Sequence, residues 1–216
     1  MSPALLRHPR FVSLEGGEGA GKTTAINAIR DCLRRHGHEV VLTREPGGTD
    51  IGDQIRAVLH DPRNTGMDAR TEILLYSASR AQHAAQRIRP ALAAGKIVIS
   101  DRYADSTLAY QGYGRGLDLE TLRTITAFAT GGLTPDLTLY LDITSQEGLQ
   151  RRRLGGGEWN RLDAETLGFH QRVRSGYLEL ADLEPERWVV IDAARSVEEV
   201  QAEIRSLVKA RLDIGC

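Results

Sequence analysis

A glycine-rich segment between a strand pattern and a helix pattern constrains the fold of this chain more than any other feature. Residues 16–23 read GGEGAGKT; the apolar run 11–15 precedes them and the amphipathic stretch 23–36 follows. In this G-x-x-x-x-G-K-[ST] pattern, glycines let backbone N–H groups turn inward around phosphate oxygens, and the helix N-terminus adds a favourable dipole. The segment therefore predicts a nucleoside triphosphate site formed by Gly16, Gly17, Glu18, Gly19, Ala20, Gly21, Lys22, Thr23 and Thr24.

Two side chains of this segment have the chemistry that a bound triphosphate requires. The ammonium group of Lys22 can reach the β- and γ-phosphates, and the hydroxyl of Thr23 can ligate Mg²⁺. The alternative is a glycine-rich turn that happens to precede a helix. Because the pattern and its strand–helix context are both met, we favour the phosphate site, which by itself does not say what the triphosphate is used for.

Short β-branched runs alternate with longer amphipathic stretches along the whole chain. We predict strands at 11–15, 39–43, 97–100, 137–141 and 188–191. We predict helices at 23–36, 50–60, 69–94, 117–130, 145–154, 164–181 and 197–212, with a kink or break near Pro90. This alternation indicates an α/β fold in one domain, 1–216, with a five-stranded, mainly parallel sheet flanked by helices. Such sheets bind ligands at the carboxyl ends of their strands.

The composition is that of an ordinary globular protein, with 41% hydrophobic and 26% charged residues, and it excludes a disordered chain or a membrane bundle. The formal net charge of −1, from 28 basic and 29 acidic residues, argues against nucleic-acid binding. No segment resembles a signal peptide or approaches the roughly 20 apolar residues of a membrane span. We therefore expect a cytoplasmic protein that binds neither nucleic acid nor membrane. The six histidines are scattered and predict no metal site.

Four further blocks narrow the function. TREPGGT (43–49) follows the second predicted strand, YSASR (76–80) lies on the long helix, DRY (101–103) follows the third strand, and STLAYQGYGR (106–115) comes next. Together with residues 16–23, these blocks resemble the thymidylate kinase family over nearly the whole chain. The resemblance implies a P-loop nucleoside monophosphate kinase fold with a small lid, and transfer of the ATP γ-phosphoryl group to dTMP to give dTDP and ADP. It also implies Mg²⁺ with ATP, and a homodimer.

The composition of the motifs agrees with such a transfer. The acceptor would be a phosphate monoester, largely dianionic near neutral pH because its second pKa is about 6. Its oxygen is a ready nucleophile, so no general base is required. The protein must instead align two anionic groups and neutralise charge between them, which predicts arginines and a lysine around the site.

The resemblance assigns contacts with dTMP to a set of residues drawn from several blocks: Glu18, Glu45, Arg56, Tyr76, Arg80, Arg102, Ser106, Tyr110 and Gln111. It implies that Tyr76 stacks on thymine and that Arg80 and Gln111 bond to the edge of the base. It implies that Tyr110 lies beneath the sugar and disfavours a 2′-hydroxyl, and that Glu18 binds the 3′-hydroxyl. From pattern alone, Tyr76 could equally be a core residue, and Tyr110 and Gln111 could be ordinary loop residues.

The resemblance also implies which charged side chains surround the phosphates. Arg56 would bind the acceptor phosphate, and catalytic Arg102 would lie between acceptor and donor. Asp101, also predicted to be catalytic, would lie near magnesium and act through water. Glu45 would lie near magnesium and its waters. The pattern alone would favour Arg56 on the solvated face of its helix, and Asp142 competes with Asp101 because it also ends an apolar strand.

The predicted lid, at about 150–163, is where the resemblance is weakest. Gly19 occupies a slot where one class of the family has an arginine, so positive charge must come from the lid, where Arg151, Arg153 and Arg161 are the candidate catalytic arginines. The glycines at 155–157 would permit opening and closing. The chain has Asn160 before Arg161 where the family often has aspartate, so the arginine that contacts the phosphate stays open. The alternatives are a solvated helix end or, less favoured, a nucleic-acid patch.

Three other functions compete with phosphorylation of dTMP. A kinase for dUMP, UMP or GMP would be separated by the pocket for the thymine 5-methyl group, and a single methyl group gives only roughly 10–200-fold discrimination. A GTP-dependent switch would carry a guanine-reading N-K-x-D segment, which this sequence lacks. An ATPase regulator would not need the acceptor-side residues Arg56, Tyr76, Arg80 and Gln111.

Overall fold

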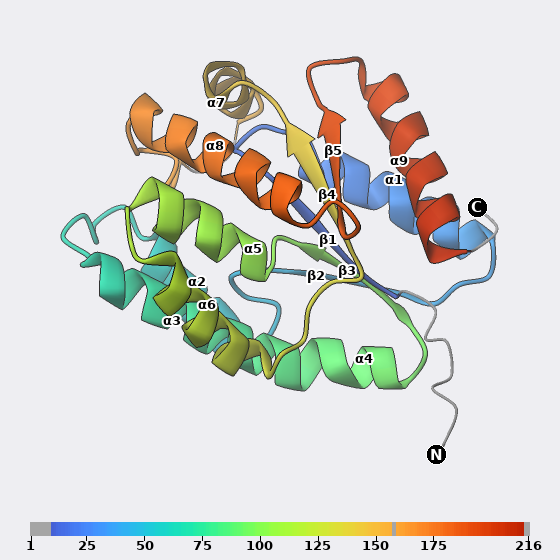
Figure 1. Ribbon diagram of the computed structural model, residues 1–216, viewed down its shortest axis with the longest axis horizontal. Coiled ribbons are helices and arrows are strands. Elements are labelled where there is room, and N and C mark those ends of the chain that lie inside the picture. The colour runs from blue at the N-terminus through green and yellow to red at the C-terminus, as the bar shows by residue number, and fades with distance from the viewer. Residues whose placement is uncertain (1–9, 157–158, 214–216) are drawn as a thin grey trace.

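A parallel sheet forms the centre of the computed structural model, which describes residues 10–156 and 159–213. Within these residues the sheet has five strands in the order β2-β3-β1-β4-β5, and every neighbouring pair is parallel (Figure 1). The strands are β1 (Phe11–Gly16), β2 (Val40–Arg44), β3 (Ile97–Asp101), β4 (Leu137–Asp142) and β5 (Trp188–Asp192). The predicted α/β fold is confirmed.

Helices follow each strand along the chain and cover both faces of the sheet. They are α1 (Lys22–Arg35), α2 (Asp50–His60), α3 (Ala69–His83), η1 (Ala84–Ile88), α4 (Arg89–Ala93), α5 (Ala104–Thr107), η2 (Leu108–Gly114), α6 (Leu119–Thr130), α7 (Ser145–Leu154), α8 (Leu167–Leu183) and α9 (Val197–Leu212). Segments η1 and η2 are π-helical. Of the helices in the described ranges, none is long and apolar enough to cross a membrane.

Successive side chains of each strand enter different cores, as the two-residue period of a strand requires. Val12 and Leu14 of β1 pack in the core under α1 and α9, whereas Phe11 packs with Ile88 and Val98 on the opposite face. Figure 1 shows α1 and α9 on one side of the sheet and α8, α5, α6 and α4 on the other. Because both faces of the sheet are covered, the strands are nearly continuous apolar runs, and these runs predicted the strands in the sequence.

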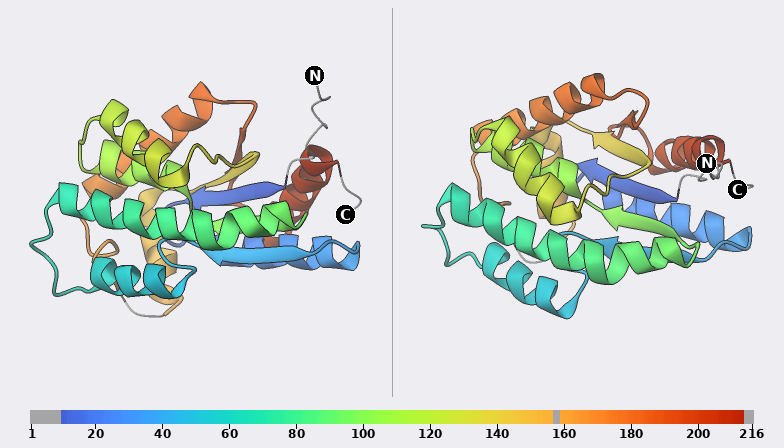
Figure 2. Two further views of the ribbon diagram at one scale, coloured as in Figure 1. Left: turned by 90° about the horizontal axis from the view of Figure 1, so that it is seen from below. Right: turned by 60° about the horizontal axis from the view of Figure 1, so that its bottom comes forward.

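The long predicted helix 69–94 is one continuous helical run that changes its winding before Pro90. Segment α3 passes into the π-helical η1 and then into α4, and Figure 2 shows the three as a single rod along the sheet. Proline lacks an N–H and its ring crowds the carbonyl four residues earlier, here that of Gln86. The wider π turns occur where that helical hydrogen bond is lost, so the predicted irregularity near Pro90 takes the form of a bulge.

A helix that the sequence did not predict follows β3. Residues 104–114 form α5 and η2, although Thr107, Gly112 and Gly114 are poor helix formers. The segment packs closely against α8, and Leu108, Ala109 and Tyr110 are buried there. Tertiary packing therefore overrides local propensity, and it turns this segment toward the carboxyl edge of the sheet.

Candidate active site

A cavity of about 620 Å³ opens at the carboxyl ends of β1, β2 and β3. The predicted residues that line it are Glu18, Gly19, Ala20, Gly21, Lys22, Thr23, Thr24, Glu45, Arg56, Tyr76, Arg80, Asp101, Arg102, Ser106, Tyr110, Gln111 and Arg151. The predicted phosphate loop, residues 16–24, and the predicted acceptor residues thus share one space. Gly16, Gly17, Arg153 and Arg161 were also predicted for the site, and within the described part of the chain they are not among its lining residues.

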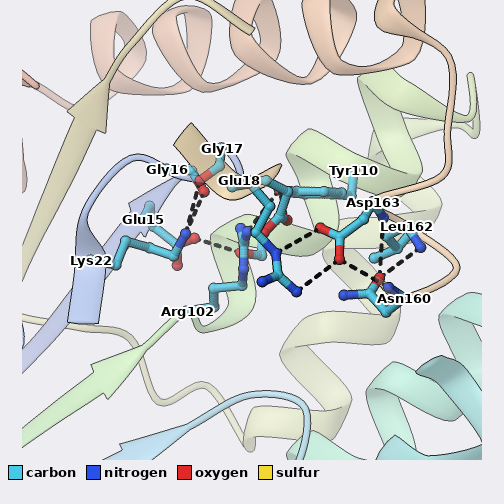
Figure 3. Close-up of polar contacts among 12 residues, drawn as sticks. Glu15, Gly16, Gly17, Glu18, Lys22, Arg102, Tyr110, Asn160, Leu162 and Asp163 are labelled. Carbon is cyan, nitrogen blue, oxygen red and sulfur yellow. Dashed lines mark hydrogen bonds and ion pairs between the residues drawn. The ribbon is translucent and has the colours of Figure 1, made fainter. Parts of the chain in front are cut away.

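Lys22 lies folded back against its own loop. Its Nζ donates to the carbonyl oxygens of Gly16 (3.1 Å) and Gly17 (2.9 Å), as Figure 3 shows. Burial, and then the neighbouring charge of Arg102, lower the pKa of Lys22 below its ordinary value. Gly16 and Gly17, which lie outside the cavity lining, therefore hold the Lys22 ammonium group against the loop through their carbonyl oxygens.

Arg102 joins the phosphate loop to the opposite wall of the cavity. Its Nη2 donates to Glu18 (2.7 Å) and to the Tyr110 hydroxyl (2.8 Å), and that hydroxyl donates to Glu18 at 3.0 Å (Figure 3). Burial opposes ionisation of Glu18, but Arg102, Lys22 and the Tyr110 hydrogen bond outweigh it and hold the pKa of Glu18 at about 2. Glu18 is therefore a carboxylate at neutral pH, and Arg102 a permanent cation.

The backbone of Arg102 is strained, and its neighbours hold it in place. Its φ of 67° lies in the left-handed region, which costs a residue with a side chain roughly 1–2 kcal/mol. The N–H of Arg102 donates to the Leu14 carbonyl (2.9 Å), and the Ser100 hydroxyl donates to the Arg102 carbonyl (2.6 Å). Strain of this kind persists where the surroundings over-determine it, as in functional sites.

Glu15 is a buried carboxylate that the sequence analysis treated only as the end of a strand. It accepts hydrogen bonds from the Tyr103 N–H (2.8 Å), the Ser106 hydroxyl (2.5 Å) and the Tyr177 hydroxyl (2.9 Å). Burial, and then the charge of Asp105, raise the pKa of Glu15 to about 6. Glu15 therefore ties the start of the 103–114 segment to the central strand. The sequence signal was a charged residue inside an apolar run.

On the acceptor side, Glu45 fixes the guanidinium group of Arg80. Arg80 is 1% exposed, and its Nε donates to one Glu45 oxygen at 2.7 Å while His83 Nδ1 lies 2.9 Å from the other. Arg80 also donates to the Thr107 hydroxyl (2.8 Å) and to the Tyr103 carbonyl (3.2 Å). Glu45, predicted near magnesium, thus has its carboxylate oxygens engaged by Arg80 and His83.

Three other predicted acceptor residues border the same space. Arg56 donates from Nη1 to the Pro46 carbonyl at 3.0 Å, and its own burial, followed by the charge of Arg44, lowers its pKa. Tyr76 is 9% exposed and belongs both to the core and to the cavity wall. The sequence left open whether Tyr76 is a core residue or a site residue. In the structure its ring belongs both to a hydrophobic core and to the cavity lining. Gln111 also lines the cavity and donates to the buried carboxylate of Glu72 at 2.8 Å.

The donors around the phosphate loop fit a magnesium ion that arrives with a nucleotide. Asp101 lines the cavity with Thr23, and its Oδ1 is buried without a hydrogen-bond partner in the described structure. The competing Asp142 is held by two 2.7 Å bonds from Arg174 and does not line the cavity. Among residues 10–156 and 159–213, no cluster of three His, Cys, Asp or Glu forms a metal cage. Mg²⁺ commonly takes few protein ligands and completes its shell with phosphates and water.

The lid arginines divide into different environments. Arg151 lines the cavity and pairs with Glu147 at 2.7 Å. Arg153 stacks on Trp159 at 5.4 Å, and Arg161 is buried in an ion pair with Glu72 at 2.5 Å. The glycine run of the predicted lid is described at Gly155 and Gly156, whereas residue 157 lies outside the described residues.

Arg152, which the sequence analysis did not select, also lines the cavity. Its Nη2 donates to Asp163 at 3.1 Å and its Nη1 to the Gly156 carbonyl at 2.9 Å. Figure 3 shows Asp163 near Asn160, whose N–H donates to it at 3.0 Å. The sequence signal was Gly148, one helical turn before Arg152, because the two residues share one face of α7.

Helix α7 reaches the phosphate loop through a contact between two glycines. A Cβ on Gly19 would lie 2.0 Å from the Gly148 carbonyl oxygen, and a Cβ on Gly148 would lie 2.4 Å from the Glu18 carbonyl oxygen. Gly19 also has a φ of 69°, which side-chain-bearing residues rarely adopt. With α7 in this position no arginine fits at residue 19, and the helix instead brings Arg151 and Arg152 beside the loop.

Comparisons with known proteins agree with the geometry. The family model described as thymidylate kinase matches residues 14–204. A thymidylate kinase of Desulfovibrio desulfuricans is 52% identical over 212 residues, which cover 94% of this chain and 96% of that protein. Thymidylate kinases of Roseiflexus sp. and Bacillus pumilus are 51% and 49% identical, each over 94% of this chain and over 94% and 96% of their own lengths.

The glycine contact yields a prediction. We expect Gly148→Ala to slow ATP turnover roughly 10- to 100-fold, because the methyl group would push α7 and its cavity-lining arginines away from the loop. The rate of turnover at saturating substrate measures this effect, and thermal unfolding of the same preparation shows whether the variant is folded. Gly168→Ala is the matched control, since its methyl group would meet atoms no nearer than 3.8 Å. Unchanged turnover of Gly148→Ala would show that the loop does not depend on α7.

Proposed function

Because this chain belongs to the thymidylate kinase family and phosphorylates dTMP to dTDP, we propose that its cavity holds ATP and dTMP together for direct transfer. The observation that carries this proposal is the shared space: phosphate loop and acceptor residues line one cavity of about 620 Å³. Arg102 lies between them and is bonded to Glu18 of the loop. A cation in that position can neutralise charge on both substrates at once.

At the donor end, the loop 16–24 would hold the β- and γ-phosphates through its N–H groups and the start of α1. Lys22 would exchange the carbonyls of Gly16 and Gly17 for phosphate oxygens. Thr23 would ligate Mg²⁺ and Asp101 would hold one of its waters, which the unpartnered Oδ1 of Asp101 supports. When bound with ATP, the metal would neutralise charge that develops on the phosphates.

At the acceptor end, Arg56 would bind the dTMP phosphate and Tyr76 would stack on thymine. Arg80 and Gln111 would bond to the edge of the base, an assignment that the rigid anchoring of Arg80 supports. Tyr110 would lie under the deoxyribose, and the nearby residues Glu18 and Ser106 would complete the sugar side.

The reaction requires no proton acceptor from the protein. An oxygen of the dTMP phosphate attacks the γ-phosphorus, the bond from that phosphorus to the β,γ-bridging oxygen breaks, and ADP leaves as dTDP forms. The cavity offers cations for this step, and the carboxylate of Glu18 is already paired with Arg102. Alignment and charge neutralisation therefore account for the chemistry.

We propose that residues 150–163 form a lid on a single kinase domain, 1–216, with Arg151 and Arg152 facing the donor phosphates. Both arginines line the cavity, together with Gly155, Gly156 and Asn160 of the same segment. Arg153 and Arg161, which the resemblance also offered as catalytic, have other partners in Trp159 and Glu72. The use of ATP as donor supports a cytoplasmic location.

A homodimer would cover an apolar surface on two neighbouring helices. Leu74 of α3 is 59% exposed and Phe128 of α6 is 89% exposed, although α3 and α6 pack side by side. Large apolar side chains exposed on two adjacent helices support an interface between copies of the chain.

Removal of the loop lysine tests the donor end. We expect Lys22→Ala to lower kcat roughly 100- to 1,000-fold, because the developing phosphate charge loses a fixed cation. A coupled ADP-release assay with dTMP, dUMP, UMP, GMP and AMP measures it and the acceptor preference together. Lys96→Ala is the control, since that ammonium group is 40% exposed and pairs with Glu39. Absence of dTMP-dependent ADP release from the intact protein would overturn the proposal.

Removal of the acceptor arginine tests the other end. We expect Arg56→Ala to raise the KM for dTMP about tenfold or more and to leave the KM for ATP nearly unchanged. A hydrogen bond to a charged group contributes about 1.5–3 kcal/mol, and 1.4 kcal/mol is tenfold in affinity. Arg63→Ala is the control, because Arg63 is 88% exposed and pairs with Asp61. Equal rises in both KM values would contradict the assignment of Arg56 to the acceptor pocket.

Charge on the exposed apolar surface tests the homodimer. We expect Phe128→Glu to shift the protein from dimer to monomer at micromolar concentration, because apposed copies would bury two carboxylates against each other. Sedimentation equilibrium measures the mass, and Leu183→Glu, at a site on α8 that is 66% exposed, is the control. An intact protein that sediments as a monomer would contradict the proposed interface.

A further inference from the structure

A buried carboxylate behind the acceptor pocket has no part in the transfer described above. Glu72 is 1% exposed and lies on α3, one helical turn before Tyr76. Gln111 Nε2 donates to it at 2.8 Å, Arg115 Nη2 at 3.1 Å, and Arg161 Nη2 lies 2.5 Å from it. An amide from the cavity wall and two guanidinium groups thus converge on one side chain.

The surroundings of Glu72 keep it ionised. Burial alone would raise the pKa of Glu72, but the hydrogen bonds of Arg115 and Gln111 and the charges of Arg115 and Arg161 outweigh burial, and the pKa is lowered. An ionised carboxylate accepts hydrogen bonds and donates none. Whatever faces Glu72 must therefore present an N–H group to it.

This requirement fixes the orientation of the Gln111 amide. The NH₂ end of Gln111 must face Glu72, so its carbonyl oxygen is the amide atom left for a ligand. Gln111 is 2% exposed and lines the cavity. The pocket therefore offers an acceptor at this position, and a reversed amide would bring its oxygen against the Glu72 carboxylate.

Arg80 offers the opposite polarity on the same wall. A guanidinium group has five N–H donors and no acceptor, and the hydrogen bonds of Arg80 to Glu45, Thr107 and Tyr103 engage three of them. The remaining donors are available to a base that lies along Tyr76. A matching base edge has an acceptor beside a donor, which is the pattern of O4 and N3–H in thymine.

We propose that Glu72 determines base specificity in this kinase: by holding the Gln111 amide in one orientation, it excludes cytosine-type bases. Cytosine presents the reversed edge, with a donor amino group at C4 and an acceptor at N3, and both would meet the wrong partner. Glu72 is a positioning residue, since it acts on the base through Gln111. The inference rests on the proposed placement of thymine beside Arg80 and Gln111.

The other partners of Glu72 make this orientation rigid. Arg115 pairs with Glu165 at 2.6 Å as well as with Glu72, and it stacks over the Phe169 ring at 4.7 Å. Arg161 donates from Nε to the Leu59 carbonyl at 3.0 Å, so its guanidinium group is held by Leu59 as well as by Glu72. Arg161, expected on the donor phosphates, thereby becomes part of the support behind the base.

The test compares dTMP with 5-methyl-dCMP, which has the same shape and methyl group and the reversed base edge. The protein should prefer dTMP at least about a hundredfold in kcat/KM, because a mismatched edge leaves buried polar groups unpaired. In Glu72→Gln, residue 72 can face Gln111 with either its oxygen or its NH₂, so Gln111 can turn over. We expect the preference to fall at least tenfold, with the KM for ATP within twofold. Both values come from one preparation, so their ratio does not depend on the folded fraction.

A matched control separates orientation from charge. Glu165→Gln removes a carboxylate from Arg115 without touching Gln111, and it should keep the preference for dTMP. Glu72→Gln removes the counter-charge of the buried Arg161 and one of the two carboxylates that pair with Arg115, so it can impair folding. The double variant Glu72→Gln/Arg115→Gln removes one of these cations and should show the same fall.

The outcomes distinguish this inference from the proposed transfer. An unchanged preference in the folded Glu72→Gln protein or in the double variant would overturn the role of Glu72 and leave the transfer of phosphate to dTMP intact. An equal fall in Glu165→Gln would overturn it too, because the effect would then come from charge alone. If the intact protein used dTMP and 5-methyl-dCMP equally, the placement of the base beside Gln111 would itself be wrong.

Discussion

The two halves of the cavity depend on the hydrogen bonds of the Arg102 guanidinium group, whose side chain is 15% exposed. It bonds to Glu18 at 2.7 Å and to Tyr110 at 2.8 Å, so the phosphate loop and the segment after β3 are tied through one cation. Burying a charge is costly unless it is paired and hydrogen-bonded, and here the partners provide both. In the proposed transfer this cation would lie between the donor and acceptor phosphates, and its ion pair with Glu18 already joins the two walls of the cavity.

Buried carboxylates orient the other groups that would bind substrate. Glu15 holds the start of the segment that carries Tyr110, Glu45 holds Arg80, and Glu72 holds Gln111. Glu15 and Glu72 lie behind the cavity wall, Glu45 lines it, and each accepts hydrogen bonds from residues of that wall. Because the pKa of Glu72 is lowered and an ionised carboxylate only accepts, Glu72 requires the NH₂ end of Gln111 to face it. At Gln111, the polarity offered to a base would therefore be set by a carboxylate that lies behind the cavity lining.

Much of the fold could be predicted because the buried strands are nearly continuous apolar runs with glycines and charges at their ends. The five strands are of this kind. The irregular winding near Pro90 could be predicted as well, because a proline inside a helix is a local signal. The helix at 104–114 could not, since Gly112 and Gly114 weaken its local pattern and packing against α8 stabilises it. Likewise, Asp101 and Asp142 end similar strands. The structure separates them because Asp101 lines the cavity, whereas Asp142 pairs with Arg174 outside it.

The sequence by itself determined the phosphate loop, the parallel sheet and the family, because these depend on residues close together in the chain. Glycine spacing and strand periodicity are local properties, and they survive without knowledge of any distant contact. Only the tertiary structure decided which arginines of the lid segment face the cavity. Arg152 lies on the face of α7 that the Gly19–Gly148 contact turns toward the loop, whereas Arg161 pairs with Glu72, eighty-nine positions earlier in the chain. Side-chain direction at such positions is set by partners far away in sequence, and no local pattern records them.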